Sequence, residues 1–194
     1  MAIKSTLTGN VFFTKPTRIL ITPFENGVKG ETSYALDNVE ADSTSITQDD
    51  EERNEIACET RDENIYESIT LGKYQFTCNN ADWQEDLVVN ILGFTKDGDN
   101  FYAPSSYVEK FAEIEIQFGD ANDLTTYRGS AVLPKVLLSS KATMESLKTN
   151  LGMMTVSGTA YSQEITSTEG KTIISPYYIS KKPVTVNSDS EVTD

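Results

Sequence analysis

Apolar and polar residues alternate with a period of two in several short segments of this chain. In Phe111–Phe118, Ile114 and Ile116 lie on one face, and Glu113 and Glu115 lie on the other. This is the pattern of a β-strand with one packed side and one wet side. We therefore predict a strand there. The same reasoning predicts further strands at 19–22, 74–78, 129–138 and 151–161.

Turn residues separate these segments. The runs at 97–100 and 119–123 are rich in Gly, Asp and Asn, which favours a mainly β protein built from short strands. Pro134 lies inside the predicted strand 129–138. Proline has no N–H to give to a ladder, so we predict that this strand is an edge strand or is bulged at Pro134.

One segment has the period of a helix instead. Asp82 and Glu85 have the spacing of a capping box, and Gly93 suits a helix end. Between them the apolar residues share one face, which predicts a helix over about 82–92 that covers one side of the sheet. The stripe consists of Leu87, Val88, Ile91 and Leu92.

Three segments give no steady period. The segment 27–48 has few large apolar residues, and a long loop of this kind is usually functional, so we predict an extended arm there. The polar segment 186–194 predicts a flexible acidic tail after a single domain at 1–185. The segment 140–151 fits both a short helix and a long loop between strands.

The composition narrows the possible functions. The chain has 194 residues, no histidine and two cysteines. Histidine catalysis, histidine metal sites and a four-cysteine zinc site are therefore excluded. Cys58 and Cys78 could pair, but without an export signal we expect reduced thiols. No apolar run is long enough to span a bilayer, so we expect no membrane contact. The sequence marks no cleft that would hold a catalytic carboxylate pair, so we expect no enzyme activity. We also expect no cofactor.

Negative charge is concentrated in one region. The formal net charge is −14, and residues 37–67 hold twelve acidic residues against Arg53 and Arg61. The region 129–182 is mildly basic, with six Lys against three Glu. Three interpretations stay open: a solvated acidic face, a cation site at Asp49–Glu52, and self-assembly in which acidic and basic surfaces of two copies meet. The run at 49–52 lacks the alternating ligands and the glycine of a Ca²⁺-binding EF-hand loop.

Four segments, taken in order, resemble the major tail, or tail-tube, proteins of long-tailed bacteriophages. The first is an opening that leads into a long glycine-containing loop, and the second is an acidic strand. The third is a strand followed by a helix, and the fourth is a late pair of strands. Together they cover about residues 8–162 and are found at 8–11, 48–62, 74–77 with 82–93, and 131–136 with 154–161.

The resemblance implies a tail-tube-like β-sandwich with one flanking helix. Such subunits form six-fold rings that stack into a hollow tube, with an acidic lumen that lets DNA pass. A long loop and the terminal arms reach the adjacent ring. In this chain the implied lumen residues are Asp49, Glu51, Glu55, Glu59 and Arg61. The implied inter-ring loop residues are Lys29, Glu31, Tyr34, Leu36 and Val39.

Alternation within the acidic strand also predicts which side of the strand each residue faces. Ile56, Cys58 and Thr60 are expected to face the sandwich core, with Glu55, Glu59 and Arg61 on the other side. A shift of one residue in register would reverse this facing.

We expect a structural virion protein that is assembled in the host cytoplasm and resides in the tail. Its expected partners are other copies of itself, other tail or connector proteins, and viral DNA in passage. A tail ring or adaptor and a capsid decoration protein are alternatives. A secreted carbohydrate-binding sandwich is a more distant one, because the chain has no export signal and its single tryptophan, Trp83, falls at the predicted helix start.

Overall fold

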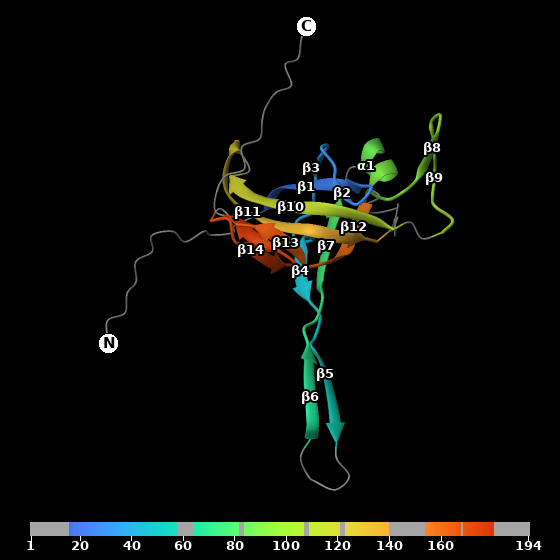
Figure 1. Ribbon diagram of the computed structural model, residues 1–194. Helices are drawn as coiled ribbons and strands as arrows, with labels where there is room; N and C mark the ends of the chain where they lie inside the picture. The colour runs from blue at the N-terminus through green and yellow to red at the C-terminus, as the bar shows by residue number, and fades with distance from the viewer. Residues whose placement is uncertain are drawn as a thin grey trace.

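The computed structural model describes residues 16–57, 64–81, 84–106, 109–120, 123–139, 154–167 and 169–180. The fold is mainly β, with antiparallel sheets and one short helix, as the sequence predicts (Figure 1). The predictions for 140–151 and 186–194 fall outside the described residues.

A nine-stranded sheet forms the body. Its strand order is β2-β1-β10-β11-β12-β7-β4, with β3 paired to β1 and β15 paired to β11. The strands of this sheet are β1 (Pro16–Glu25), β2 (Val28–Lys29), β3 (Tyr34–Leu36), β4 (Ser45–Gln48), β7 (Tyr74–Asn80), β10 (Lys110–Asp120), β11 (Asp123–Leu138), β12 (Met154–Ala160) and β15 (Tyr178–Ser180).

Three two-stranded hairpins and one helix complete the described elements. The hairpins are β5 (Glu52–Ala57) with β6 (Asn64–Thr70), β8 (Thr95–Asp97) with β9 (Asn100–Tyr102), and β13 (Gln163–Thr166) with β14 (Thr172–Ser175). The helix is α1 (Glu85–Asn90).

The alternating residues build one core, as predicted. Ile114 and Ile116 on β10 are buried, and the β1–β10 register places Ile21 and Ile19 opposite them. Phe76 is buried in the same apolar cluster. The face of β10 opposite Ile114 and Ile116 is less exposed to solvent than its charged residues predict. Gln117 is fully buried, and its Nε2 donates to Glu115 Oε1 at 3.3 Å.

Helix α1 begins later than predicted. Its N-cap is Gln84, which makes no side-chain capping hydrogen bond, so the capping box from Asp82 to Glu85 is wrong. The side chains of Gln84 and Glu85 at the helix start are engaged elsewhere. Gln84 Nε2 donates to Ala35 O at 3.2 Å, and Glu85 forms an ion pair with Lys96. The apolar stripe is correct, because all four of its residues are buried: Leu87, Val88, Ile91 and Leu92.

The predicted bulge at Pro134 is confirmed. The β10–β11 register pairs Ala112 with Val136 and Ile114 with Leu133, and shifts between them. Pro134 and Lys135 therefore share the place opposite Glu113. Because β11 pairs with β10 on one side and with β12 and β15 on the other, the bulge and not an edge position accommodates the proline.

The segment 27–48 differs from the predicted arm, because it contributes β2, β3 and β4 to the body. Leu36 is fully buried opposite Ile19, so this stretch also completes the core. Strands of two to four residues are too short to show a readable period.

The element that does project is the β5–β6 hairpin (Figure 1). It continues the β4–β7 pair beyond the body: Asp49 N–H donates to Lys73 O at 2.9 Å, and Gln48 Nε2 donates to Gly72 O at 3.2 Å. Among the described strands, β5 pairs with β6 alone. Of the residues predicted to face the core, Cys58 and Thr60 lie outside the described residues, and Ile56 belongs to β5, in the projecting hairpin.

Candidate functional site: the acidic hairpin and the Lys135 cavity

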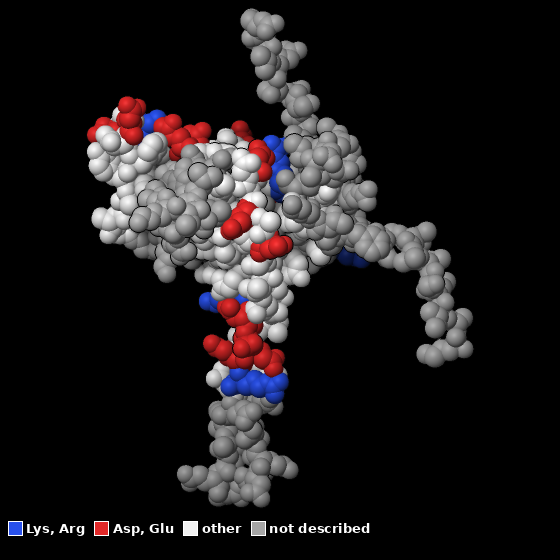
Figure 2. Space-filling view, turned by 180° about the vertical axis from the view of Figure 1, so that it is seen from behind, with Lys and Arg blue, Asp and Glu red and all other residues white. Residues whose placement is uncertain are grey.

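The predicted lumen residues gather on the β5–β6 hairpin and its base. Asp49 is exposed and accepts a hydrogen bond from Gln75 Nε2 at 2.8 Å. Glu51 is exposed, and its Oε1 lies 2.6 Å from Arg53 Nη2. Acidic side chains cluster where the hairpin leaves the body (Figure 2). Glu55 belongs to β5, while the predictions for Glu59 and Arg61 fall outside the described residues.

A glycine allows the two chains to approach closely at the hairpin base. A Cβ atom added to Gly72 would lie 1.8 Å from Asp49 O and 2.8 Å from Asp50 O. Real Cβ atoms do not approach backbone atoms so closely, so any side chain at this position would force the chains apart. Gly72 therefore fixes the direction in which the hairpin leaves the sheet.

The β5–β6 hairpin stands apart from the nine-stranded sheet (Figure 1). Its backbone register places Glu52 opposite Thr70 and Arg53 opposite Ile69. Ile69 and Leu71 are 52% and 74% exposed. A hairpin standing alone in water is marginally stable at best. This element therefore has apolar and charged surface that its own chain leaves uncovered in the described part of the structure.

The predicted inter-ring loop residues lie along the β2–β3 end of the body. Lys29 Nζ is 2.6 Å from Glu113 Oε1, and Tyr34 Oη accepts from Asn90 Nδ2 at 2.8 Å. Leu36 is in the core. Val39 packs against it and bridges to Asn80. Glu31 is exposed.

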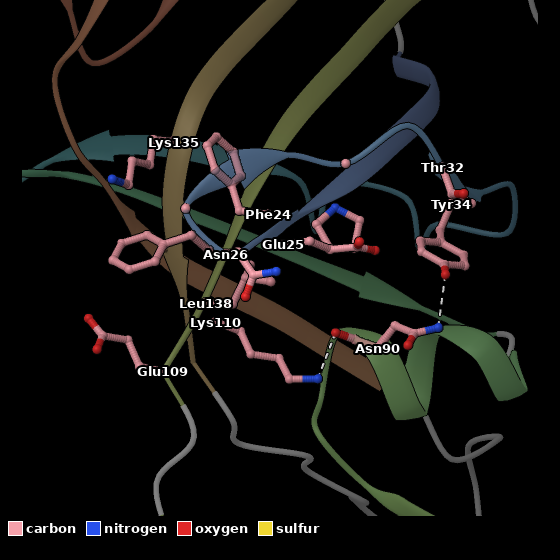
Figure 3. Close-up of a pocket in the computed structure, with 14 residues that line it drawn as sticks. Phe24, Glu25, Asn26, Thr32, Tyr34, Asn90, Glu109, Lys110, Lys135 and Leu138 are labelled. Atoms are coloured by element: carbon pink, nitrogen blue, oxygen red, sulfur yellow. Dashed lines mark hydrogen bonds between the residues drawn. The ribbon is translucent and has the colours of Figure 1, made fainter.

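The sequence does not predict a cavity of about 550 Å³ beside these residues (Figure 3). Its walls come from the end of β1, the following turn, the C-terminal end of α1, the start of β10, and β11 at the bulge. This volume is in the range of pockets that bind small molecules or side chains. The one signal in the sequence is Pro134, since bulges often redirect a side chain at a functional site.

Lys110 closes one side of the cavity. Its Nζ donates to Val89 O at 2.9 Å and to Asn90 O at 2.8 Å, both at the end of α1. Figure 3 shows the bond to Asn90. A cation there satisfies carbonyl groups that have no partner inside the helix. Desolvation by burial lowers the pKa of Lys110 below its usual value.

Lys135 occupies the opposite side and is held by aromatic rings. Its Nζ lies 4.7 Å from the ring centroid of Phe111 and 6.0 Å from that of Phe24, both within range of a cation–π interaction. Its carbonyl oxygen accepts the Tyr161 N–H at 2.8 Å, which anchors the bulge. The Lys135 ammonium forms no ion pair within the described structure.

Metal chemistry has no support among the described residues, where no group of three or more Cys, Asp or Glu side chains converges. Asp49–Glu52 all belong to this part of the chain. Cys78 is a free, buried thiol, and burial raises its pKa to about 12. The described part of the chain also contains no helix long and apolar enough to cross a bilayer.

Comparisons with known proteins give no family assignment. No family model matches the chain, and no curated protein matches it. Among solved structures, it is similar to a chain of the six-fold symmetrised cryo-EM structure of the anti-feeding prophage baseplate. The identity is 10%, the TM-score is 0.36, and the match covers 84% of this chain and 91% of that one. At this TM-score the likeness carries no functional argument.

Proposed function

We propose that this chain is a structural subunit of a bacteriophage tail that assembles with copies of itself into six-fold rings of a tail tube. The observation that carries the proposal is the β5–β6 hairpin, a two-stranded ribbon that leaves the body with exposed apolar side chains, Ile69 and Leu71, at its base (Figure 1). A partner that covers the hairpin would supply the stabilisation that its own chain does not.

The resemblance of the four sequence segments to tail-tube proteins supports the choice of partner, because those proteins associate with copies of themselves through reaching segments. In the proposal, the projecting β5–β6 hairpin is the reaching arm. The resemblance implies that the segment 27–48 makes the inter-ring contact. In the proposal this segment belongs instead to the surface that receives the arm of another copy. It supplies Gly27, Gly30, Thr32 and Tyr34 to the Lys135 cavity.

The charge distribution supports a role in DNA passage. In the proposal, Asp49 and Glu51 at the hairpin base face the bore, and a ring repeats them around its axis. A wall of summed negative charge repels phosphate, so DNA moves without binding. The other partners proposed are the tail or connector proteins that meet the ends of the tube, which places the chain in the virion tail.

Sedimentation velocity and negative-stain microscopy of the purified full chain test this proposal. We expect rings or tubes with a central hole, in an equilibrium that shifts toward assemblies as protein concentration rises. A chain that sediments as a monomer at every concentration, and shows no rings on the grid, would contradict it.

A further inference from the structure

Strand β14 has one edge that no described strand covers. It pairs with β13 alone, in a register that runs without a shift. Thr172, Ile173 and Ile174 are all exposed, and the two isoleucines are 51% and 69% exposed. An uncovered strand edge is a template for pairing with another strand. The edge of β14 therefore offers both backbone hydrogen-bonding groups and apolar side chains to a partner.

The strand also lacks the features that protect other strand edges of this protein. Charged side chains, proline and bulges keep edge strands from pairing with other molecules. The β8–β9 hairpin carries Lys96 and Asp97, and the edge strand β2 contains Lys29. The sequence of β14 is Thr-Ile-Ile-Ser, with no charged residue and no proline. Its edge is therefore open to pairing in a way that these two are not.

The hairpin register shows which backbone groups of β14 point outward. In an antiparallel pair, every second residue exchanges hydrogen bonds with its partner, and the residues between direct their N–H and C=O groups away. Ser167 N–H donates to Lys171 O at 2.8 Å, so the bonded positions continue through Ile173. The N–H and C=O groups of Thr172 and Ile174 consequently point to the free edge.

Two copies of this edge fit each other about a two-fold axis. When Thr172 of each copy pairs with Ile174 of the other, all the outward groups are bonded and Ile173 faces Ile173 of the second copy. Ile165 lies opposite Ile173 within each hairpin. Because directly opposed residues share a face, the isoleucines at these two positions then form one apolar row across both hairpins.

Charge does not oppose this register. It places Lys171 opposite Ser175 of the second copy, and Lys171 already pairs with Glu169 in its own turn, at 3.0 Å between Nζ and Oε2. Glu164 lies opposite Ile174 within its own hairpin, so the two copies bring no like charges together. An uncharged edge that matches itself favours a second copy of the same strand as its partner.

We infer that β14 pairs antiparallel with β14 of a second copy, about a two-fold axis between the two Ile173 residues. Such a contact is isologous and closes at two copies. It goes beyond the ring contact of the proposed function, since a two-fold axis joins subunits of separate rings or tubes. A strand this short makes few hydrogen bonds, so the contact is weak between isolated copies and gains strength when assemblies repeat it.

Cysteine cross-linking of the full-length chain tests this register. The background is Cys58→Ser, and Cys78 is buried. Across a non-hydrogen-bonded antiparallel pair the Cα atoms lie about 4.5 Å apart, within the range that a disulfide spans. Under mild oxidant at high protein concentration, Ile173→Cys should give a covalent dimer, read by non-reducing gel electrophoresis and intact mass.

Ile174→Cys is the matched control. Ile174 is more exposed than Ile173, so random collisions would cross-link it at least as fast. In the two-fold register, however, its Cα lies roughly 7–8 Å from its counterpart, beyond the reach of a disulfide. We expect Ile173→Cys to cross-link at least about tenfold faster, because only that pair lies in disulfide range. Equal rates, or no dimer from Ile173→Cys, would overturn the contact.

A second pair of variants shows whether the backbone makes the contact. Ile174→Pro removes an N–H group that the β13–β14 ladder does not use, and edge strands tolerate proline at such positions. In the Ile173→Cys chain it should abolish cross-linking with an unchanged thermal transition, whereas Ile174→Val should leave cross-linking intact. Cross-linking that survives Ile174→Pro would show that the strands do not pair. Rings without this cross-link would overturn the contact alone, and the cross-link without rings would overturn the proposed tail role alone.

Discussion

The side-chain amide of Gln75 joins the sheet to the hairpin base, because its Nε2 donates to Asp49 Oδ2 at 2.8 Å. On its other side, Gln75 Oε1 accepts from Thr159 Oγ1 at 2.9 Å. A hydrogen-bonded row therefore runs from β12 across β7 to the point where the hairpin leaves. The hairpin direction is thus fixed by the outer face of the sheet as well as by the chain crossing at Gly72.

Gly72→Ala should disturb this junction more than any change to an exposed charge near it. The added Cβ would meet the Asp49 carbonyl group, so the two chains must separate and the row through Gln75 must break. We expect a loss of about 1–3 kcal/mol in the free energy of unfolding, measured by urea denaturation. Gly98→Asn is the control, since Gly98 has a φ of 58° with open space around it and asparagine tolerates that conformation. A loss at Gly72 no larger than at Gly98 would contradict the close crossing.

Lys110→Met should lower stability because it removes the donors that cap α1. Two carbonyl groups at the end of the helix would lose their partner, at a cost of about 1–3 kcal/mol in the free energy of unfolding. Lys171→Met removes an exposed lysine and should change stability little. Equal urea midpoints for the two variants would show that the Lys110 bonds contribute nothing.

The same lysine gives a signed pH dependence. Burial lowers the folded-state pKa of Lys110 below the usual 10.5, so its charged form is better tolerated in the unfolded chain. This contribution opposes folding below the folded-state pKa and disappears as the pH rises toward 10.5. Relative to Lys110→Met, the wild type should therefore gain stability over that interval in urea melts at a series of pH values.

Cys78 should resist alkylation in the folded protein. Burial raises the pKa of its thiol to about 12, so the reactive thiolate is suppressed at pH 8–9. In a Cys58→Ser background, iodoacetamide should modify Cys78 only after denaturant is added, as read by mass spectrometry. The sign of the linkage follows from the same shift. The contribution of Cys78 to stability is complete below its usual pKa of 9.0 and is lost as the pH rises toward 12. Rapid native labelling would show that the site is not buried.

Much of the body could be predicted because alternation and amphipathicity report directly on burial. The spacing of apolar residues predicts the two faces of β10 and the buried face of α1. Pro134 predicts the bulge in β11, because proline has no N–H for the ladder. Alternation does not report what lies over the outer face of β10, where Gln117 is fully buried. It also cannot tell a strand that packs on the body from one that projects from it, as β5 does (Figure 1).

The cavity could not be predicted for a different reason. Its two aromatic walls, Phe24 and Phe111, are far apart in sequence, and only the pairing of β1 with β10 brings them together. Lys135 reaches them because the register shifts at the bulge. Such a site depends on the strand order and register of the sheet, and the local pattern of a single sequence predicts neither.

Removing the hairpin should separate folding from assembly. Replacing residues 50–72 by Asn-Gly joins Asp49 to Lys73 through a two-residue turn that suits an antiparallel pair. The described core residues lie in the nine-stranded sheet and in or next to α1, so we expect a cooperative thermal transition close to that of the full chain. Sedimentation should show only monomer. Rings from this shortened chain would place the contact elsewhere, and loss of the transition would mean that the hairpin is needed for folding.

Reversing the charge at the hairpin base should make the wall of the bore bind DNA instead of repelling it. Asp49→Lys with Glu51→Lys changes the net charge by the same amount as Glu164→Lys with Glu169→Lys on the β13–β14 hairpin. If the first pair faces the bore, assembled particles of that variant should retain DNA at low salt and release it as salt rises, because bound phosphates release counterions. The second variant should not retain DNA inside the bore. Retention can be read by nuclease protection of DNA mixed with the assemblies. Equal protection by both variants would mean that overall charge, and not the position of Asp49 and Glu51, governs DNA contact.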